Sequence, residues 1–530
     1  MKRLLAVFLS AVCISSCIKN DLPYPLVVPS ISSLTATGAK GCSIDSDART
    51  VVIDLEETTD IAAVEITSVT LSEGAVADPQ IIGRHDMRSP FHVTISTYQD
   101  YQWTFSATQS IERYFSVEGQ VGASEIDAEN CRAIAHVRST TDLENIKVRS
   151  LKLGPEGITQ YSIPFSQMHD FSDCIQVDVT AHSRTQTWRL FVEQTETLVE
   201  LTSVSPWTRV AWLSATGLSD ADNGFRYRQV GSDEWKDVRN VVSDGGSFSA
   251  MLEPLLPQTT YECMAFSGDN ETDAVTFTTD PEAQLPNSGF ETYSQPESKN
   301  YYSFFDPAST AQEMMTKWWD SGNAGSTTVG ASYSICTPDT EDFKEGKASV
   351  RMNSRNVVIK FAAGNMFSGE FAGVIGTQGG KVNFGRPFTL RPRSLRLWLK
   401  YKSGSIDCIG TYPDSDPVKM GDSDRGTVYV ALGDWDYHRY GGTPQSPVQV
   451  NTTDKSTLFK PDAEAVIAYG SWNATSSTDG WVQVEIPLVY NSVTRRPTHI
   501  IVSCAASALG DYFTGSSQSV LWVDDMQLVY

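Results

Sequence analysis

One alternating stretch decides the fold class: Leu395-Arg396-Leu397-Trp398-Leu399-Lys400-Tyr401. Successive side chains of a β-strand point to opposite faces of a sheet, so the leucines share one face and Arg396, Trp398 and Lys400 share the other. The stretch Trp481-Val482-Gln483-Val484-Glu485-Ile486 alternates in the same way, with Gln483 and Glu485 facing away from the valines. Such alternation predicts strands buried on one face, and therefore an all-β chain of layered sheets.

Composition limits the class of partner. The chain has 530 residues, with 64 acidic and 41 basic side chains and a formal net charge of -23. Binding to nucleic acid needs a basic surface, so this balance argues against a nucleic-acid partner. Hydrophobic residues make up 40% of the chain, which is enough to build cores. The length predicts several domains, because a domain typically has about 150 residues.

The first residues form a targeting signal. Met1-Lys2-Arg3 is positive, Leu4 to Ile14 is apolar, and Ile14-Ser15-Ser16-Cys17 has the pattern of a lipobox. We expect residues 1–16 to be removed, Cys17 to carry lipid, and 17–26 to form a tether. No later stretch approaches 18 uncharged apolar residues, so the lipid anchor is the only membrane contact expected. An ordinary signal peptide that happens to contain a cysteine is the alternative.

The remaining cysteines do not form a recognisable metal or disulfide pattern. They are odd in number, widely spaced and without a C-x-x-C pair, which favours buried, unpaired side chains. Their positions are Cys42, Cys131, Cys174, Cys263, Cys336, Cys408 and Cys504.

Residues 27–106 and 107–196 repeat one pattern. Thr58-Thr59-Asp60-Ile61 recurs as Thr140-Thr141-Asp142-Leu143, and each copy ends in an alternating strand that contains Trp103 or Trp188. The spacing between these two copies fits tandem small β-sandwiches. The pattern resembles the immunoglobulin-like modules of Bacteroides surface lipoproteins, which implies a role as spacers.

Residues 197–280 contain a motif of another sandwich family. Leu255-Leu256-Pro257-Gln258-Thr259-Thr260-Tyr261 resembles the tyrosine corner of fibronectin type III domains, in which the Tyr hydroxyl bonds to upstream backbone. The resemblance implies a scaffold that spaces or binds.

Residues 284–530 form the last predicted domain. Pro286-Asn287-Ser288-Gly289-Phe290-Glu291 and the closing stretch Val520 to Leu528 resemble the first and last strands of a galactose-binding-like jelly roll. The domain also resembles the putative carbohydrate metabolism domain family of Bacteroides lipoproteins, which implies carbohydrate handling and leaves catalysis open. The stretches that carry this resemblance include 317–323, 362–369, 383–388 and 510–515.

A carbohydrate-binding face is predicted on the alternating strands. Sugar rings stack on aromatic side chains, and their hydroxyls bond to charged or amide groups. We therefore expect the site to be formed by Arg396, Trp398, Lys400, Gln483 and Glu485. Its rim is expected from the loop aromatics Trp318, Trp319, Trp435, Tyr437 and Tyr440. In the alternative interpretation, loops cover this face and Trp398 belongs to the core.

Catalytic motifs are weak. Gly380-Lys381 is not part of a phosphate loop. That motif needs Gly where the chain has Ile375, and Ser or Thr where it has Val382. The glycines of 361–385 are instead expected at tight turns and close backbone contacts. A glycosidase needs two carboxylates at a defined separation, which a sequence cannot supply. The crowded acids that leave this alternative open are Asp407, Asp414, Asp416, Asp422, Asp424, Asp434 and Asp436.

A structural calcium ion is predicted where the first and last strands of the jelly roll meet. The expected ligands are Glu291 with Asp524 or Asp525, joined by Glu345 or its carbonyl, because Ca²⁺ prefers oxygen ligands. In the alternative, one acid meets Lys347 or Arg351 and the other faces water. No catalytic cofactor is expected.

Three functions remain open at this stage. The first is a lipoprotein of the outer membrane, facing the cell exterior, that binds a glycan or polysaccharide through 284–530. The second is a glycoside hydrolase or related carbohydrate enzyme. The third is a structural or adhesive protein that binds protein partners.

Overall fold

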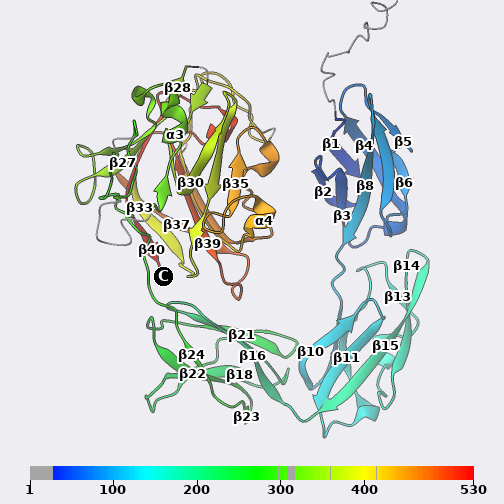
Figure 1. Ribbon diagram of the computed structural model, residues 1–530. Coiled ribbons are helices and arrows are strands. Elements are labelled where there is room, and N and C mark those ends of the chain that lie inside the picture. Colours follow the sequence, from blue (N-terminus) through cyan, green and yellow to red (C-terminus); the bar gives the residue numbers. More distant parts are fainter. Residues whose placement is uncertain (1–27, 296–298, 307–316, 359, 414, 475) are drawn as a thin grey trace, which may run out of the picture. The chain divides into compact units, whose positions relative to one another are not determined.

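The protein is built almost entirely of β-strands (Figure 1). The computed structural model describes residues 28–295, 299–306, 317–358, 360–413, 415–474 and 476–530. Strands account for 49% of the described residues and helices for 6%, which confirms the all-β prediction. Within those residues no helix has both the length and the apolar character needed to span a bilayer. Cys17, the signal peptide and the tether lie outside the described residues.

The chain divides into two compact units. One covers the described residues up to 117 together with 125–134 and 142–192, and the other covers 118–124, 135–141 and 193–530. This division does not test the module boundaries expected near residues 106, 196 and 280, which stay predictions.

The first predicted module consists of two sheets with strand orders β1-β4-β6 and β2-β3-β8-β7-β5. Its core contains Trp103 and Phe105, both fully buried. Its strands are β1 (Ile31–Ala36), β2 (Ala39–Asp45), β3 (Thr50–Leu55), β4 (Val64–Leu71), β5 (Val76–Asp78), β6 (Gly83–His85), β7 (Phe91–Ser96) and β8 (Asp100–Gln109).

The second predicted module repeats two local structures of the first. Asp60 caps a 3-10 turn by accepting the N–H of Ala62 at 3.0 Å, and Asp142 caps the equivalent turn by accepting that of Glu144 at 3.1 Å. Trp188 is fully buried, like Trp103. The repeated tetrapeptides therefore share one structural role. The strands are β9 (Tyr114–Val117), β10 (Gln120–Asp127), β11 (Arg132–Arg138), β12 (Val148–Lys152), β13 (Gln160–Tyr161), β14 (Ile175–Ala181) and β15 (Arg184–Thr195).

The tyrosine corner is confirmed in the fibronectin-like region. The hydroxyl of Tyr261 accepts the N–H of Leu256 at 2.9 Å. The second module has a similar contact that sequence reasoning missed, since Tyr161 accepts the N–H of Leu153 at 2.9 Å. The strands of the fibronectin-like region are β16 (Val199–Pro206), β17 (Ala211–Gly217), β18 (Asn223–Gln229), β19 (Lys236–Val238), β20 (Val242–Asp244), β21 (Ser247–Leu252), β22 (Thr260–Ser267), β23 (Asn270–Glu271) and β24 (Val275–Thr278).

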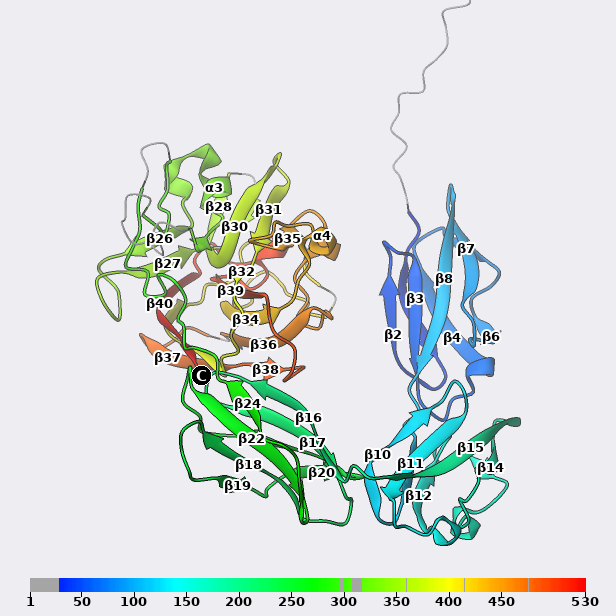
Figure 2. The ribbon, with the colours of Figure 1, turned by 60° about the horizontal axis from the view of Figure 1, so that its bottom comes forward.

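The C-terminal domain is a sandwich of two large sheets. The five-stranded sheet has the order β26-β27-β40-β33-β37, and the nine-stranded sheet follows β35-β31-β30-β39-β34-β36-β38, with β25 and β32 added at its side. Figure 2 shows the β30 and β31 hairpin beside β35.

The elements of this domain have the following bounds: β25 (Trp319–Asp320), α3 (Asn323–Ser326), β26 (Cys336–Asp339), β27 (Ser349–Asn353), β28 (Arg355–Val357), β29 (Lys360–Ala362), β30 (Asn365–Ile375), β31 (Gly379–Phe384), β32 (Arg386–Pro387), β33 (Ser394–Lys402), β34 (Thr427–Gly433), α4 (Tyr437–Tyr440), β35 (Val448–Asn451), β36 (Val466–Asn473), β37 (Val482–Pro487), β38 (Val489–Tyr490), β39 (His499–Ala505) and β40 (Val520–Val529).

The core lies between these two sheets. Leu395, Leu397 and Leu399 of β33 are fully buried there, as the alternating pattern predicts. From the opposing sheet, Val428 of β34 and Val502 of β39 pack into the same cluster. Because side chains alternate along a strand, the residues next to these two valines must point to the outer face of the nine-stranded sheet.

The opening segment of the domain differs from the expected first strand. Residues 286–289 form turns. This segment contacts β40 through individual hydrogen bonds and not through a continuous strand ladder. Met526 donates its N–H to the carbonyl of Ser288 at 3.0 Å, and the side chain of Gln284 bonds to both the N–H and the carbonyl of Leu528. The positive φ of 49° at Asn287 breaks the extended conformation that a strand needs.

Candidate functional site

The structure places the five residues of the predicted binding face together. Trp398 pairs with Gln483 and Arg396 with Glu485 across β33 and β37, and Lys400 follows on the same face. Gln483 and Glu485 are exposed, whereas the three β33 residues are half-buried. Whether this face binds a sugar stays a prediction.

Protein groups already occupy the aromatic rings of this face. The ammonium of Lys344 lies 4.2 Å from the centre of the Trp398 ring, and that of Lys400 lies 4.4 Å from the Trp522 ring. Lys400 also forms an ion pair with Asp342. A sugar that stacked on Trp398 would first have to displace Lys344, which a cation–π contact holds there.

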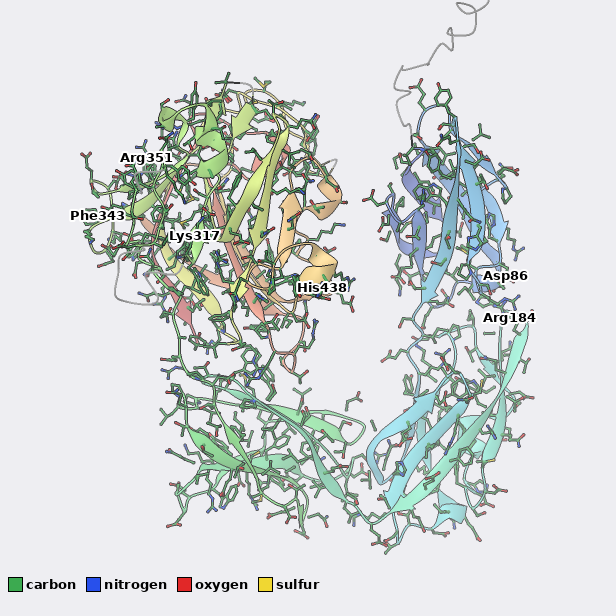
Figure 3. All side chains as sticks on the ribbon, in the orientation of Figure 1. Asp86, Arg184, Lys317, Phe343, Arg351 and His438 are labelled. Carbon is green, nitrogen blue, oxygen red and sulfur yellow. The ribbon has the colours of Figure 1, made fainter. Side chains whose placement is uncertain are left out.

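The loop between β26 and β27 supplies this cover. Phe343, within that loop, and Arg351, in β27, are labelled in Figure 3 at the edge of the domain. Trp481 donates its indole N–H to Asp342 at 2.8 Å, which ties the loop to the start of β37. The alternative in which loops cover this face therefore describes most of it, although Trp398 is not in the core.

Two of the predicted rim aromatics must be corrected. Trp319 is fully buried and Trp435 is 4% exposed, so both rings are in hydrophobic clusters and cannot form a rim. Trp318 and Tyr437 are half-buried on separate elements, next to Lys317 and His438, which Figure 3 labels. The remaining aromatic, Tyr440, is half-buried at the end of α4.

The expected calcium ligands divide into two groups. Glu291 and Asp524 are neighbours: burial raises the pKa of Asp524, its bonds to backbone N–H groups lower it, and the charge of Glu291 raises it further. By contrast, Asp525 accepts bonds from Gln527, and Glu345 is exposed and contributes its N–H rather than an oxygen.

Backbone amides surround these two carboxylates. Asp524 accepts the N–H groups of Lys344 at 2.7 Å and Glu345 at 3.0 Å, and Glu291 accepts that of Lys347 at 3.0 Å. Among the described residues no group of three or more His, Cys, Asp or Glu side chains is placed to hold a metal. The amides therefore offset much of the negative charge, and the calcium proposal is confined to Glu291 and Asp524.

Calcium is expected to stabilise this junction. A carboxylate oxygen that accepts one N–H keeps a lone pair for a cation, and an ion at about 100 times its Kd contributes about 2.7 kcal/mol. Chelation should then lower the midpoint of the C-terminal transition by about 5 °C in calorimetry. Glu291→Gln should abolish this difference, whereas the control Asp525→Asn should keep it. Equal midpoints in calcium and in chelator would show that the amides suffice.

A cavity of about 320 Å³ opens on the outer face of the nine-stranded sheet. Its floor comes from three neighbouring strands, because Phe367 of β30 pairs with Ser503 of β39, which pairs with Tyr429 of β34. These residues alternate with core residues such as Val428 and Val502, so the floor is separate from the domain core.

Glycines shape the cavity wall around Phe371. A Cβ at Gly325 of α3 would lie 3.0 Å from the Phe371 ring, and one at Gly380 of β31 would lie 3.3 Å from it. The ring therefore packs closely between α3 and β31, where a side chain at either glycine would crowd it. At the tip of the hairpin, Gly376 has a φ of 50°, which confirms the expected turn role of a glycine in 361–385.

The polar groups of the cavity include one carboxylate among the described lining residues, that of Asp511. Asp511 is exposed as a residue, but desolvation of its carboxyl group raises its pKa, and the positive charge of Lys455 opposes this effect. Burial also raises the pKa of Tyr429, and the charge of Asp511 raises it further, so its hydroxyl is neutral at physiological pH. The side chain of Asn365 bonds to another residue of the cavity wall, because its amide oxygen accepts the N–H of Gly322 at 2.8 Å.

The crowded aspartates do not form a catalytic pair in this cavity. Asp424 is 4% exposed and bonds to Ser507 and to the backbone of Ser516, and Asp416 pairs with Arg425. Of the others, Asp407, Asp422, Asp434 and Asp436 make local contacts, and Asp414 lies outside the described residues. Hydrolysis by two carboxylates is therefore not supported by the lining that the structure describes.

Sequence reasoning missed this cavity, although a signal for it was present. The stretches that carry the family resemblance, 317–323, 362–369 and 510–515, contribute Gly322, Asn365 and Asp511 to the lining. Interpreting those stretches as neighbours in space would have indicated a site on the outer face of this sheet.

Comparison with known proteins finds a family model that matches the same part of the chain. Residues 289–529 match the family described as Putative carbohydrate metabolism domain, which confirms the resemblance. No curated protein matches the chain.

Two of the solved structures that align with the chain are the following. One is described as a putative glycoside hydrolase from Bacteroides thetaiotaomicron VPI-5482; it has 14% identity and a TM-score of 0.31, and the alignment covers 96% of this chain and 98% of that one. Another is described as a putative glycoside hydrolase from Bacteroides vulgatus ATCC 8482; it has 20% identity and a TM-score of 0.34, with 46% of this chain and 96% of that one covered.

Proposed function

Because residues 289–529 match the carbohydrate metabolism family, we propose that this protein binds a carbohydrate in the cavity of its C-terminal domain. The observation that carries the proposal is the position of that cavity, which is lined by residues from the stretches that resemble the family. The N-terminal sandwiches then serve as spacers.

The chemistry of the lining fits a sugar. Phe371 and Tyr429 offer aromatic faces on which the C–H groups of a pyranose stack. Asp511 and Ser503 supply acceptors and donors for hydroxyls. Small-molecule sites have volumes of about 300–1,000 Å³, so this cavity suits a short saccharide or one end of a longer chain.

Binding without catalysis is the form of the proposal that the lining supports best. A hydrolase acting through two carboxylates would need a second acid beside Asp511. The glycoside hydrolase alternative predicts turnover on a polysaccharide panel, and binding to a protein partner predicts no signal on a glycan array. These two measurements separate the three functions.

The proposal includes an outer-membrane anchor at the cell surface. Its support is the lipobox Ile14-Ser15-Ser16-Cys17 and the positive residues before it. Mass spectrometry of the mature N-terminus tests it: an unmodified terminus at another residue would contradict lipidation of Cys17.

Phe371→Ala is expected to weaken glycan binding by about tenfold or more, because it removes an aromatic wall of the cavity. The matched control is Trp398→Ala, which removes an aromatic ring from the other sheet and should leave affinity unchanged. Titration calorimetry with the tightest oligosaccharide from a glycan array measures both, and thermal melting confirms that both variants fold.

The same pair of variants distinguishes the cavity from the face predicted first. Loss of binding in Trp398→Ala with retention in Phe371→Ala would move the site to the five-stranded sheet. An array on which the intact protein binds no glycan would reject carbohydrate binding altogether.

A further inference from the structure

Two lysines meet at one aromatic ring beside the cavity. The ammonium of Lys360 lies 4.0 Å from the centre of the Phe513 ring, and that of Lys455 lies 5.7 Å from it. Phe513 lines the cavity, as does Lys360. Lys455 also lies 4.4 Å from the ring of Tyr512, so aromatic faces hold both cations in place.

Neither charge is paired directly with a carboxylate among the described residues, although Asp511 acts on Lys455 through space. Lys455 donates to the main-chain carbonyls of Asp511 at 2.6 Å and Thr452 at 3.2 Å, and Lys360 donates to the carbonyl of Gln378. Carbonyls position an ammonium without cancelling its charge. In the described part of the chain neither lysine forms an ion pair with a carboxylate, including that of Asp511.

The charge of one lysine acts on the other. Burial lowers the pKa of Lys455, the carboxylate of Asp511 opposes this, and the positive charge of Lys360 lowers it again. Two like charges held together cost free energy unless an anion lies between them. Such a positive pair stands out in a chain whose formal net charge is -23.

We propose that the ligand of the cavity is an anionic saccharide, whose carboxylate or sulfate group is bound by Lys360 and Lys455 where they meet beside Phe513. This inference rests on the proposed carbohydrate-binding function. Each ammonium has three N–H donors, of which Lys360 uses one and Lys455 two in the contacts above. One donor or more therefore remains on each lysine, and a bond from an ammonium to an anionic oxygen is stronger than one between neutral groups.

The test compares ligands that differ only in charge. The intact protein is titrated with oligogalacturonate, oligoglucuronate and oligomannuronate, with the methyl ester of each, and with neutral and O-sulfated galacto-oligosaccharides of equal length. We expect at least one uronate or sulfated probe to bind about tenfold or more tightly than its uncharged counterpart. The preference should shrink as salt rises, because salt screens exposed charges.

Lysine variants then assign the preference to the pair. Lys360→Gln and Lys455→Gln should each lower the affinity for the charged probe by about fivefold, and the double variant should bind charged and uncharged probes equally. Lys402→Gln, an exposed lysine at the end of β33 on the other sheet, is the matched control and should change nothing. Thermal melting checks the fold of each variant.

The outcomes separate this inference from the proposed function. Uronate binding identifies a carboxylate ligand, and binding of only the sulfated probe identifies a sulfate ester. Equal or tighter binding of the uncharged probes overturns the anionic preference and leaves carbohydrate binding intact. A charge preference that survives in the double variant overturns the role of the two lysines. Absence of binding by every probe contradicts both proposals.

Discussion

Asn323→Ala is expected to lower the free energy of unfolding of the C-terminal domain by about 3–5 kcal/mol. Asn323 is fully buried and joins α3 to the start of β26. Its amide oxygen accepts the N–H groups of Ile335 at 2.9 Å and Cys336 at 3.0 Å, and its amide nitrogen donates to the carbonyl of Cys336 at 2.6 Å. Alanine leaves the N–H groups of Ile335 and Cys336 without this acceptor and the carbonyl of Cys336 with only the distant Ser334 hydroxyl at 3.4 Å, and each unpaired buried group costs about 1–3 kcal/mol.

Asn323→Asp is the matched control for this contact. Aspartate keeps the shape and accepts both N–H groups, but it cannot donate to Cys336 and it adds a buried charge. It should also destabilise, and its cost should decrease at low pH, where the acid protonates and regains a donor. Calorimetry of the intact protein at two pH values measures both variants. A loss below about 1 kcal/mol in the alanine variant would show that water replaces the amide.

Trp319→Ala is expected to cost about 3–5 kcal/mol, because it removes the largest fully buried side chain near the start of the C-terminal domain. The ring packs against Phe290 at a centroid distance of 5.5 Å, and its indole N–H donates to the carbonyl of Pro286 at 2.9 Å. These contacts hold the opening turns of the domain, so the variant should lower the melting midpoint by about 5–10 °C.

Its neighbour supplies the comparison. Trp318 is half-buried and its indole nitrogen has no hydrogen-bond partner among the described residues, so Trp318→Ala should cost less than half as much. Calorimetry on both variants tests the correction of Trp319 from a rim residue to a core residue. A melting midpoint unchanged by Trp319→Ala, with glycan affinity reduced, would return this residue to the binding site.

The sequence was a good guide to which strands form. It was a poorer guide to which face of a sheet stays open to solvent. The alternation of Leu395, Leu397 and Leu399 correctly placed them in the core and placed Trp398 opposite. Whether a loop then covers that opposite face depends on Lys344 and Asp342, which are more than 50 residues earlier in the chain. Periodicity describes one strand at a time, so it contains no information on such long-range cover.

Adjacent tryptophans show the same limit on a smaller scale. Residues 318 and 319 were treated alike, but neighbours on an extended chain point to opposite sides, and only the surrounding sheets decide which one is buried. The glycines of 361–385 were correctly assigned to turns and close contacts. Their second role, shaping a wall around Phe371, depends on α3 and β31 meeting in space, which no local pattern contains.

The calcium prediction identified the neighbouring carboxylates but not the backbone N–H groups that accompany them, and the ion itself stays a prediction. Glu291 and Asp524 were expected to be neighbours, and they are. The repulsion between them was assigned to a metal ion, because the backbone N–H groups of residues 344–347 that accompany them depend on the path of a loop and not on residue type.

The size of the cavity has a consequence for how this protein would meet a polymer. In the proposed function, a volume of about 320 Å³ is taken to hold a terminal sugar rather than the middle of a polysaccharide chain. The number of binding sites that a polysaccharide offers to this protein then depends on how many chain ends it has and not on its mass. Partial depolymerisation would multiply those sites, so a cell carrying this protein would hold freshly cut fragments more readily than the intact polymer from which they came.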